Sequence, residues 1–268
     1  MVRTLRRGAS AALVAMLLTT GGGVATAAPA GAGAADAATQ ALLKQSGGTA
    51  RVAFHDKTGK VRFFSTQSTN GVLSPTARSF TAAGASPEKA ARGFLADYGN
   101  AFGIADAEKD LALMRERSLS KGASVVRFQQ LHHGLPVIGG ELIVHEDARR
   151  AVTCALGKAM PDIDVNTQPG VASTVAEENA RALCARLYGV PGGLLVATTP
   201  RLSVYAPALM GAPGIQKPML VWQLEIQGGG TDQPIHEFVL VEAHTGKVVL
   251  HFSKIYEAKN RKVYNCNH

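Results

Sequence analysis

Two His-Glu pairs are the residues of this 268-residue chain whose types and spacing come closest to a known catalytic motif. A zinc protease of the His-Glu-x-x-His type needs both imidazoles and the general base on one face of a helix. After the pair at residues 145–146, the position of the second histidine holds Arg149, and after residues 236–237 it holds Leu240. Both pairs lie in strand-like sequence, where this spacing does not converge on one ion. The sequence therefore predicts no zinc-protease site at either pair.

The other histidines and the cysteines also lack the spacing of a catalytic or metal site. His132 and His133 are adjacent in a predicted strand and should point to opposite faces, so they cannot share an ion. The three cysteines, Cys154, Cys184 and Cys266, are an odd number without a C-x-x-C pair, which supports neither a disulfide framework nor a cysteine zinc site. A Cys154–Cys184 disulfide and two buried free thiols are both open, and free thiols are the preferred interpretation. We therefore expect no catalytic residue, metal or cofactor in this chain.

The first residues predict export. A basic start is followed by an apolar run over residues 8–24 and a small-x-small site at residues 25–27, which is the pattern of a cleaved signal peptide. A membrane anchor is the alternative, but the apolar core is short for a membrane span. The net charge is +8 at pH 7, and the basic residues are scattered rather than interleaved with aromatics, which argues against nucleic-acid binding. The expected location is extracellular, without membrane attachment after cleavage.

The first half of the chain predicts one helix and several strands. Residues 28–48 are rich in alanine and glycine and should form a disordered leader. Residues 51–64 predict a hairpin. The Ser-Pro-Glu start at residues 86–88 predicts a helix that ends before Gly103, and residues 111–117 add a strand.

The most strongly patterned stretch is residues 125–147, which predict a tight β-meander. Pro136 cannot donate a ladder hydrogen bond and should lie at an edge or a strand start. The Gly139-Gly140 pair predicts a bulge or a close backbone approach. Arg127 and Gln129 share one strand face. They either bind a partner surface, brace the glycine-rich turns, or belong to a polar face paired within the domain.

The second half predicts another helix on a meander. Residues 161–169, with two prolines, form the expected connector. A capping-box spacing at residues 174–177 predicts the helix start. Strands are predicted at residues 202–206, 220–227, 235–242 and 248–252. The fold class is therefore α+β, with two lobes that each pack a helix on an antiparallel meander.

The run R-F-Q-Q-x-x-x-G-L-P-V-x-G-G-E-L resembles the propeptide domain shared by thermolysin-like and fungalysin-like zinc metalloproteases. The resemblance implies a prodomain that chaperones and inhibits a protease and carries out no chemistry itself. Its domain would cover residues 49–162. The motif residues that it implies are Arg127, Gln129, Gly134, Pro136, Val137, Gly139 and Gly140.

The second half is similar to the small PepSY domain that accompanies this propeptide domain, through V-W-Q-L-E-I and A-H-T-G-K-V. The resemblance implies a cystatin-like second lobe over residues 163–255. Residues 256–268 resemble the junction between a prodomain and its mature protease. Candidate protease contacts in that segment are Lys259, Asn260, Arg261, Lys262 and Tyr264.

These resemblances imply a secreted, non-catalytic partner of a thermolysin-like catalytic domain, which it meets in cis or in trans. Zinc, with calcium as a second candidate, would lie on that catalytic domain. Two alternatives stay open. The chain could be a truncated precursor of such a protease, or it could be an extracellular ligand-binding module.

Overall fold

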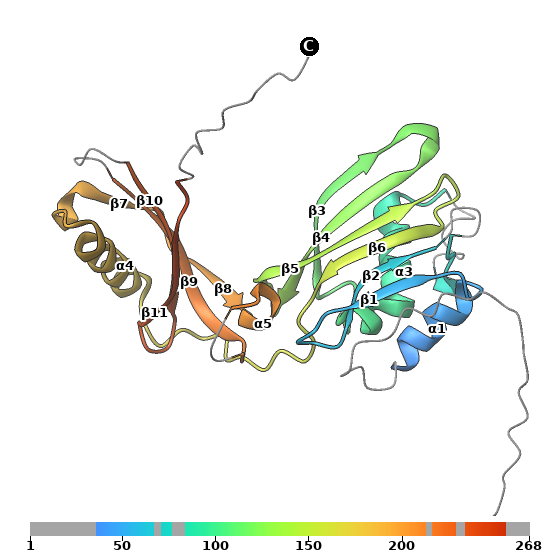
Figure 1. Ribbon diagram of the computed structural model, residues 1–268, viewed down its shortest axis with the longest axis horizontal. Helices are drawn as coiled ribbons and strands as arrows, with labels where there is room; N and C mark the ends of the chain where they lie inside the picture. The colour runs from blue at the N-terminus through green and yellow to red at the C-terminus, as the bar shows by residue number, and fades with distance from the viewer. Residues whose placement is uncertain (1–35, 67–70, 77–83, 213–215, 229–233, 256–268) are drawn as a thin grey trace, which may run out of the picture. The chain divides into compact units, whose positions relative to one another are not determined.

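The computed structural model describes residues 36–66, 71–76, 84–212, 216–228 and 234–255. This part of the chain is α+β and contains a large mixed sheet of eleven strands and four α-helices (Figure 1). The predicted signal peptide and the predicted C-terminal contact residues lie outside the described residues. Within the described residues, none of the helices combines the length and apolar character needed to cross a membrane.

Six strands of the first half form an antiparallel arrangement in the order β1-β2-β6-β5-β4-β3. Helix α3 (Pro87–Phe102) packs on one face of these strands and supplies Phe94 and Phe102 to their core (Figure 1). Its predicted start is confirmed, because the Ser86 hydroxyl accepts a hydrogen bond from the Lys89 amide at 3.3 Å. The strands are β1 (Arg51–Phe54), β2 (Val61–Ser65), β3 (Leu111–Ser118), β4 (Ser124–His132), β5 (Leu135–Glu146) and β6 (Val152–Lys158).

The prediction of a disordered leader is wrong for residues 36–48. Helix α1 (Ala37–Gln45) forms there, and the Asp36 carboxylate caps it by accepting a hydrogen bond from the Thr39 amide at 2.8 Å. Leu42 is completely buried in the core beneath α3. A sequence poor in large apolar residues is therefore ordered through one well-placed leucine and a capping aspartate.

The second half places helix α4 (Ser173–Tyr188) along one face of β7, β9 and β10 (Figure 1). The predicted capping box is not formed, because Ala172 is the N-cap residue and Glu177 instead pairs with Arg181. The buried stripe of α4 is narrow, consisting of Ala176, Ala180 and Cys184, and Leu187 is 52% exposed. The strands are β7 (Leu195–Ala197), β8 (Arg201–Tyr205), β9 (Met219–Gly228), β10 (Ile235–Glu242) and β11 (Val248–Ser253).

Strand β9 contributes buried side chains from both of its faces at its centre. Trp222 is half-buried beside the core under α4, and its indole N–H donates to the Val171 carbonyl at 2.9 Å. On the other face, Val221 is fully buried with Tyr205 and Leu240.

Strand β5 joins the two halves. Its residues Val137 and Ile138 pair in parallel with Val204 and Tyr205 of β8, so the sheet is mixed rather than two separate antiparallel meanders. Around this junction Val137 and Val204 are buried with Leu209 of the short helix α5 (Pro207–Met210). Half-buried residues of the predicted connector, Ile163 among them, pack on the same cluster.

Candidate functional site

The meander of β3, β4 and β5 contains the motif that the sequence predicted. Its polar residues Arg127 and Gln129 make different contacts. Arg127 on β4 forms an ion pair with Glu141, which lies two residues out of direct register on β5; its Nε–Oε2 distance is 2.9 Å. The arginine is 46% exposed and the glutamate 33%. This pair therefore lies on the solvent side of the meander and is paired within the molecule.

The side-chain amide of Gln129 donates hydrogen bonds to backbone carbonyls at the glycine-rich segment. Its Nε2 lies 2.7 Å from the carbonyl oxygen of Val137, 2.8 Å from that of Gly140 and 3.0 Å from that of Gln130. These carbonyls lie where β5 leaves its regular register with β4. Residues 137–140 of β5, which have no direct partner on β4 in this register, are called the glycine bulge below. The side-chain amide therefore supplies the donors that the interrupted ladder cannot supply.

The Gly139-Gly140 pair lies in a bulge, as the sequence predicted, and neighbouring side chains pack closely against both glycines. A Cβ at Gly140 would lie 2.7 Å from the Gln130 Oε1 atom, and one at Gly139 would lie 2.7 Å from the Met210 sulfur. Gly139 also has a φ of +78°, which L side chains rarely adopt. Pro136 is the second residue of β5 and so lies close to the strand start. A residue without an amide N–H is tolerated at that place.

The histidines of the meander turn lie closer together than adjacent strand residues would. His133 has a φ of +49°, so the chain has already left the strand, and the two imidazole rings of His132 and His133 meet edge to face at 4.4 Å. Burial lowers the pKa of His132, and the neighbouring His133 lowers it further. Among the residues that the structure describes, no group of three or more potential ligand side chains surrounds these rings.

The His-Glu pairs lie on strands β5 and β10, as their sequence predicted. Each glutamate is buried while the histidine before it lies on the opposite strand face. Glu237 accepts a hydrogen bond from the Tyr188 hydroxyl at 2.6 Å, and His236 contacts Glu225 at 2.6 Å. The histidine and the glutamate of each pair therefore lie on opposite strand faces and do not converge on one site.

Glu146, at the end of β5, is the one buried acid among the described residues of the first half. Its Oε2 accepts a hydrogen bond from the Ser124 hydroxyl at 2.9 Å, the Arg150 guanidinium lies 3.9 Å away, and its Oε1 has no partner among the described residues. Burial raises the pKa of this carboxyl to about 8, and the Ser124 hydrogen bond and Arg150 offset that rise only in part. The sequence singled out this residue only as part of a His-Glu pair and did not predict its burial, which depends on how distant segments cover the sheet.

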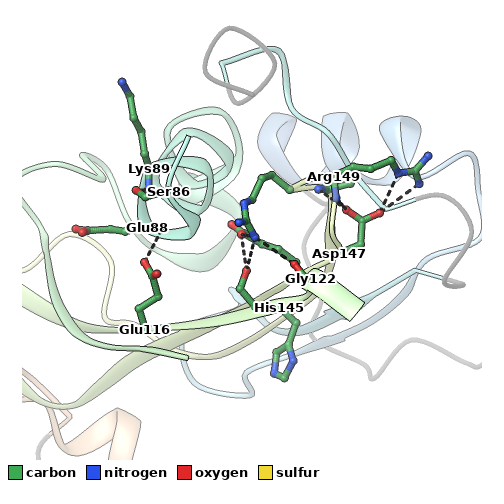
Figure 2. A network of polar contacts seen from close by, with 12 residues as sticks. Ser86, Glu88, Lys89, Glu116, Gly122, His145, Asp147 and Arg149 are labelled. Atoms are coloured by element: carbon green, nitrogen blue, oxygen red, sulfur yellow. Dashed lines mark hydrogen bonds and ion pairs between the residues drawn. The ribbon is translucent and has the colours of Figure 1, made fainter. Parts of the chain in front are cut away.

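Polar contacts around Glu146 connect β3, the β5–β6 turn and the start of α3. Figure 2 shows Glu116 reaching the backbone of Glu88, whose amide donates to the Glu116 carboxylate at 3.1 Å. It also shows Arg149 lying against Asp147, at 3.2 Å between Nη2 and Oδ2. Asp147 in turn accepts from the Ala151 amide at 2.9 Å. The Asp147 contacts hold the β5–β6 turn, and the Glu116 contact joins β3 to the start of α3.

Two of the cysteines lie within the described residues, and both are free thiols. Cys184 is buried on α4, and burial raises its pKa to about 11, with a further contribution from Glu237. Cys154 on β6 is half-buried, and burial raises its pKa as well. Neither thiol is activated, since a nucleophilic cysteine needs a lowered pKa. Cys266 and the candidate contacts Lys259, Asn260, Arg261, Lys262 and Tyr264 lie outside the described residues.

Comparison with known proteins adds one family match. No curated protein matches the chain. The solved structure of the C-terminal domain of YpeB from Bacillus megaterium is similar over 81% of this chain and 95% of its own length, at 12% identity and a TM-score of 0.31, values too low to support an inference. Residues 109–157, however, match the Fungalysin/Thermolysin Propeptide Motif. The segment that folds as β3 to β6, with the Gln129 hydrogen bonds and the glycine bulge, therefore carries the fungalysin/thermolysin propeptide motif.

Proposed function

We propose that this protein is a secreted, non-catalytic prodomain that chaperones and inhibits a thermolysin-like zinc metalloendopeptidase. The observation that carries the proposal is the propeptide motif over residues 109–157. It includes the glycine bulge, where the Gln129 side chain donates hydrogen bonds to the Val137 and Gly140 carbonyls. A rigid, preformed surface suits a protein that must bind a folded partner, because less conformational entropy is lost on binding.

The proposal extends to the arrangement of the chain. Residues 1–27 would be the signal peptide, residues 49–162 the propeptide domain and residues 163–255 a cystatin-like PepSY domain. Since α1 packs on α3, we propose that the propeptide domain begins at Asp36 rather than at residue 49. Residues 256–268 would contribute to contact with the protease, whether that protease is met in cis or in trans.

Inhibition and refolding assays test the proposal. Purified residues 28–268 should inhibit thermolysin in solution, and should raise the yield of active enzyme when its denatured catalytic domain is refolded, because a ligand of the native state stabilises that state. The same preparation should not cleave casein with or without added zinc. Digestion of the chain by thermolysin without inhibition would contradict the proposal, as would zinc-dependent, chelator-sensitive proteolysis by the chain alone.

A ligand-binding module is the second candidate, because a surface hollow is lined by basic groups that include Lys57, Arg62 and Lys158. Two of these groups are already engaged with the backbone. Lys158 donates to the Leu209 carbonyl at 2.7 Å and Arg62 to the Phe54 carbonyl at 3.0 Å. The hollow therefore offers fewer unengaged donors than its composition suggests, and the prodomain is the better-supported function.

A further inference from the structure

The register of the first six strands separates their side chains into two sets that face opposite sides of the sheet. Residues directly opposite one another in an antiparallel pair share a face. One row of the first set crosses the strands under α3 and is buried at every position between the edge strands. Its buried members are Phe64, Ala155, Val144 and Val126, and it ends at the half-buried Val52 on the edge strand β1 and at Glu116 on the edge strand β3.

The opposite face, here called the open face, is only partly buried. Its two rows follow from the same pairings, and their side chains are half-buried or exposed. The first row is Ala53, Phe63, Leu156, Ile143, Arg127 and Arg115. The second row is Arg51, Ser65, Cys154, His145, Val125 and Arg117.

The composition of the open face differs from centre to rim. Its centre is apolar, formed by Phe63, Leu156 and Ile143, and Phe63 is 37% exposed. Its rim is arginine, with Arg51 at one side and Arg115 and Arg117 on the edge strand at the other, all three exposed. An apolar centre with arginine around it is the composition of protein–protein interfaces.

The charges of the sheet are sorted by face. Glu116 of β3 lies on the α3 side, where it accepts the Glu88 amide at 3.1 Å. The neighbouring Arg115 and Arg117 belong to the open face. The acid adjoining the two rows, Glu141, is neutralised by its ion pair with Arg127. The open face therefore presents a net positive charge around its apolar centre.

We propose that the open face is the docking surface for an acidic, partly apolar region of the protease catalytic domain. This inference rests on the proposed function and adds which surface is used and what chemistry it recognises. A second copy of this chain is a poor occupant, because two arginine-rimmed faces repel each other. The chain's own C-terminal residues are equally unsuited, since Lys259, Arg261 and Lys262 carry the same sign.

Two variants of residues 28–268 test the docking surface through the inhibition constant against thermolysin. Arg115→Glu with Arg117→Glu changes only exposed rim residues. It should raise the inhibition constant at least about tenfold, and the remaining inhibition should lose most of its salt dependence, because rim charges act mainly through steering. Ile143→Asp introduces a charge at the apolar centre and should also raise the constant at least about tenfold. Circular dichroism verifies that each variant is folded.

The matched control is Lys44→Glu with Arg186→Glu, which makes the same charge change at exposed positions of α1 and α4. It should leave the inhibition constant within about threefold of the wild type, since distant surface charges couple weakly in salt. If the wild type inhibits and both open-face variants inhibit equally well, the inference is wrong while the proposed function stands. If the control weakens inhibition as much as the rim variant does, net charge rather than the open face is responsible, and the inference again fails.

Two further outcomes overturn the inference. Absence of inhibition by the wild type removes the proposed function and the docking surface with it. Sedimentation with phosphatidylglycerol vesicles separates a membrane role from a protein role. If the rim variant loses vesicle binding that the wild type shows, but keeps full inhibition, the open face serves an anionic membrane instead.

Discussion

Arg127 and Gln129 lie two residues apart on one strand face, yet their removal should have different consequences. The Arg127–Glu141 pair is exposed to solvent, where water already satisfies both groups and exposed ion pairs contribute little. Gln129 is half-buried. Its side-chain amide donates to backbone carbonyls of the glycine bulge that have no donor on the neighbouring strand. The cost of removing a residue therefore depends on what its removal leaves unpaired.

We expect Gln129→Ala to lower the free energy of unfolding by about 1–3 kcal/mol, the cost of leaving buried carbonyls unsatisfied. Arg127→Ala should lower it by at most about 1 kcal/mol. Urea denaturation followed by circular dichroism measures both values. Equal losses in the two variants would show that the brace is not what holds the glycine bulge.

Glu146 makes the stability of the protein depend on pH. Its ordinary pKa is 4.5, and burial raises the folded-state value to about 8. Between these pH values the unfolded chain releases the proton while the folded protein keeps it. The folded state therefore binds more protons, and the free energy of unfolding falls as pH rises through this window.

In the wild type, the Glu146 contribution should decrease the free energy of unfolding by a few kcal/mol between pH 5 and pH 8, since one pKa unit corresponds to about 1.4 kcal/mol. Glu146→Gln cannot ionise, so its stability should vary much less over the same range. Urea denaturation at pH 5, 6, 7 and 8 checks this, with the exposed Glu108→Gln as a control that keeps the wild-type slope. An unchanged slope in Glu146→Gln would contradict the assignment.

At the scale of elements, α1 shows how a segment of weak intrinsic preference becomes ordered. Its only large buried side chain is Leu42, which enters the core that α3 forms on the sheet. The Asp36 cap adds a charge-assisted hydrogen bond and an ion pair with Lys60 at 2.8 Å. The helix therefore belongs to the folded unit.

Leu42→Ala should destabilise the protein by about 2–5 kcal/mol, the usual cost of a large-to-small change in a core. Gln45→Ala, at an exposed position on the same helix, should change the stability by less than about 0.5 kcal/mol. Thermal denaturation of the two variants distinguishes a packed helix from a dispensable leader. A wild-type melting temperature for Leu42→Ala would restore the interpretation of a disordered leader.

At the scale of the whole molecule, β5 couples two cores that would otherwise be separate. One core lies under α3 and the other under α4. Val137 is completely buried where β5 pairs with β8, in a third, smaller cluster. Because the third cluster contains residues from both halves of the chain, its integrity should determine whether they unfold together.

The single tryptophan, Trp222, reports on the second half, whereas far-UV circular dichroism reports on both. In the wild type the two probes should give one urea transition. Val137→Asp buries a charge at the junction and should separate the transitions, with the midpoint of one probe shifted from that of the other. Val249→Asp, on the partly exposed strand β11, is the control. Coincident transitions in Val137→Asp would show that the junction does not couple the halves.

Local sequence was sufficient for most elements of the fold. The hairpin of β1 and β2, the start of α3 and the strands of the meander follow from alternation, capping residues and turn residues, which act over a few neighbours. The glycine bulge was also predictable, because glycine readily adopts the positive φ that Gly139 has there. The capping box at residues 174–177 was not formed, since the helix starts one residue before the predicted Thr174 cap and Glu177 pairs with Arg181.

The sequence by itself determined the α+β class, the propeptide motif of residues 109–157 and which residues face together along each strand. Only the tertiary structure decided that Gln129 serves the bulge, that Glu146 is buried, that α1 is ordered and that β5 pairs in parallel with β8. The physical reason is the distance along the chain over which each effect acts. Periodicity and capping depend on residues within one or two turns, whereas burial and strand pairing depend on segments brought together from distant parts of the chain.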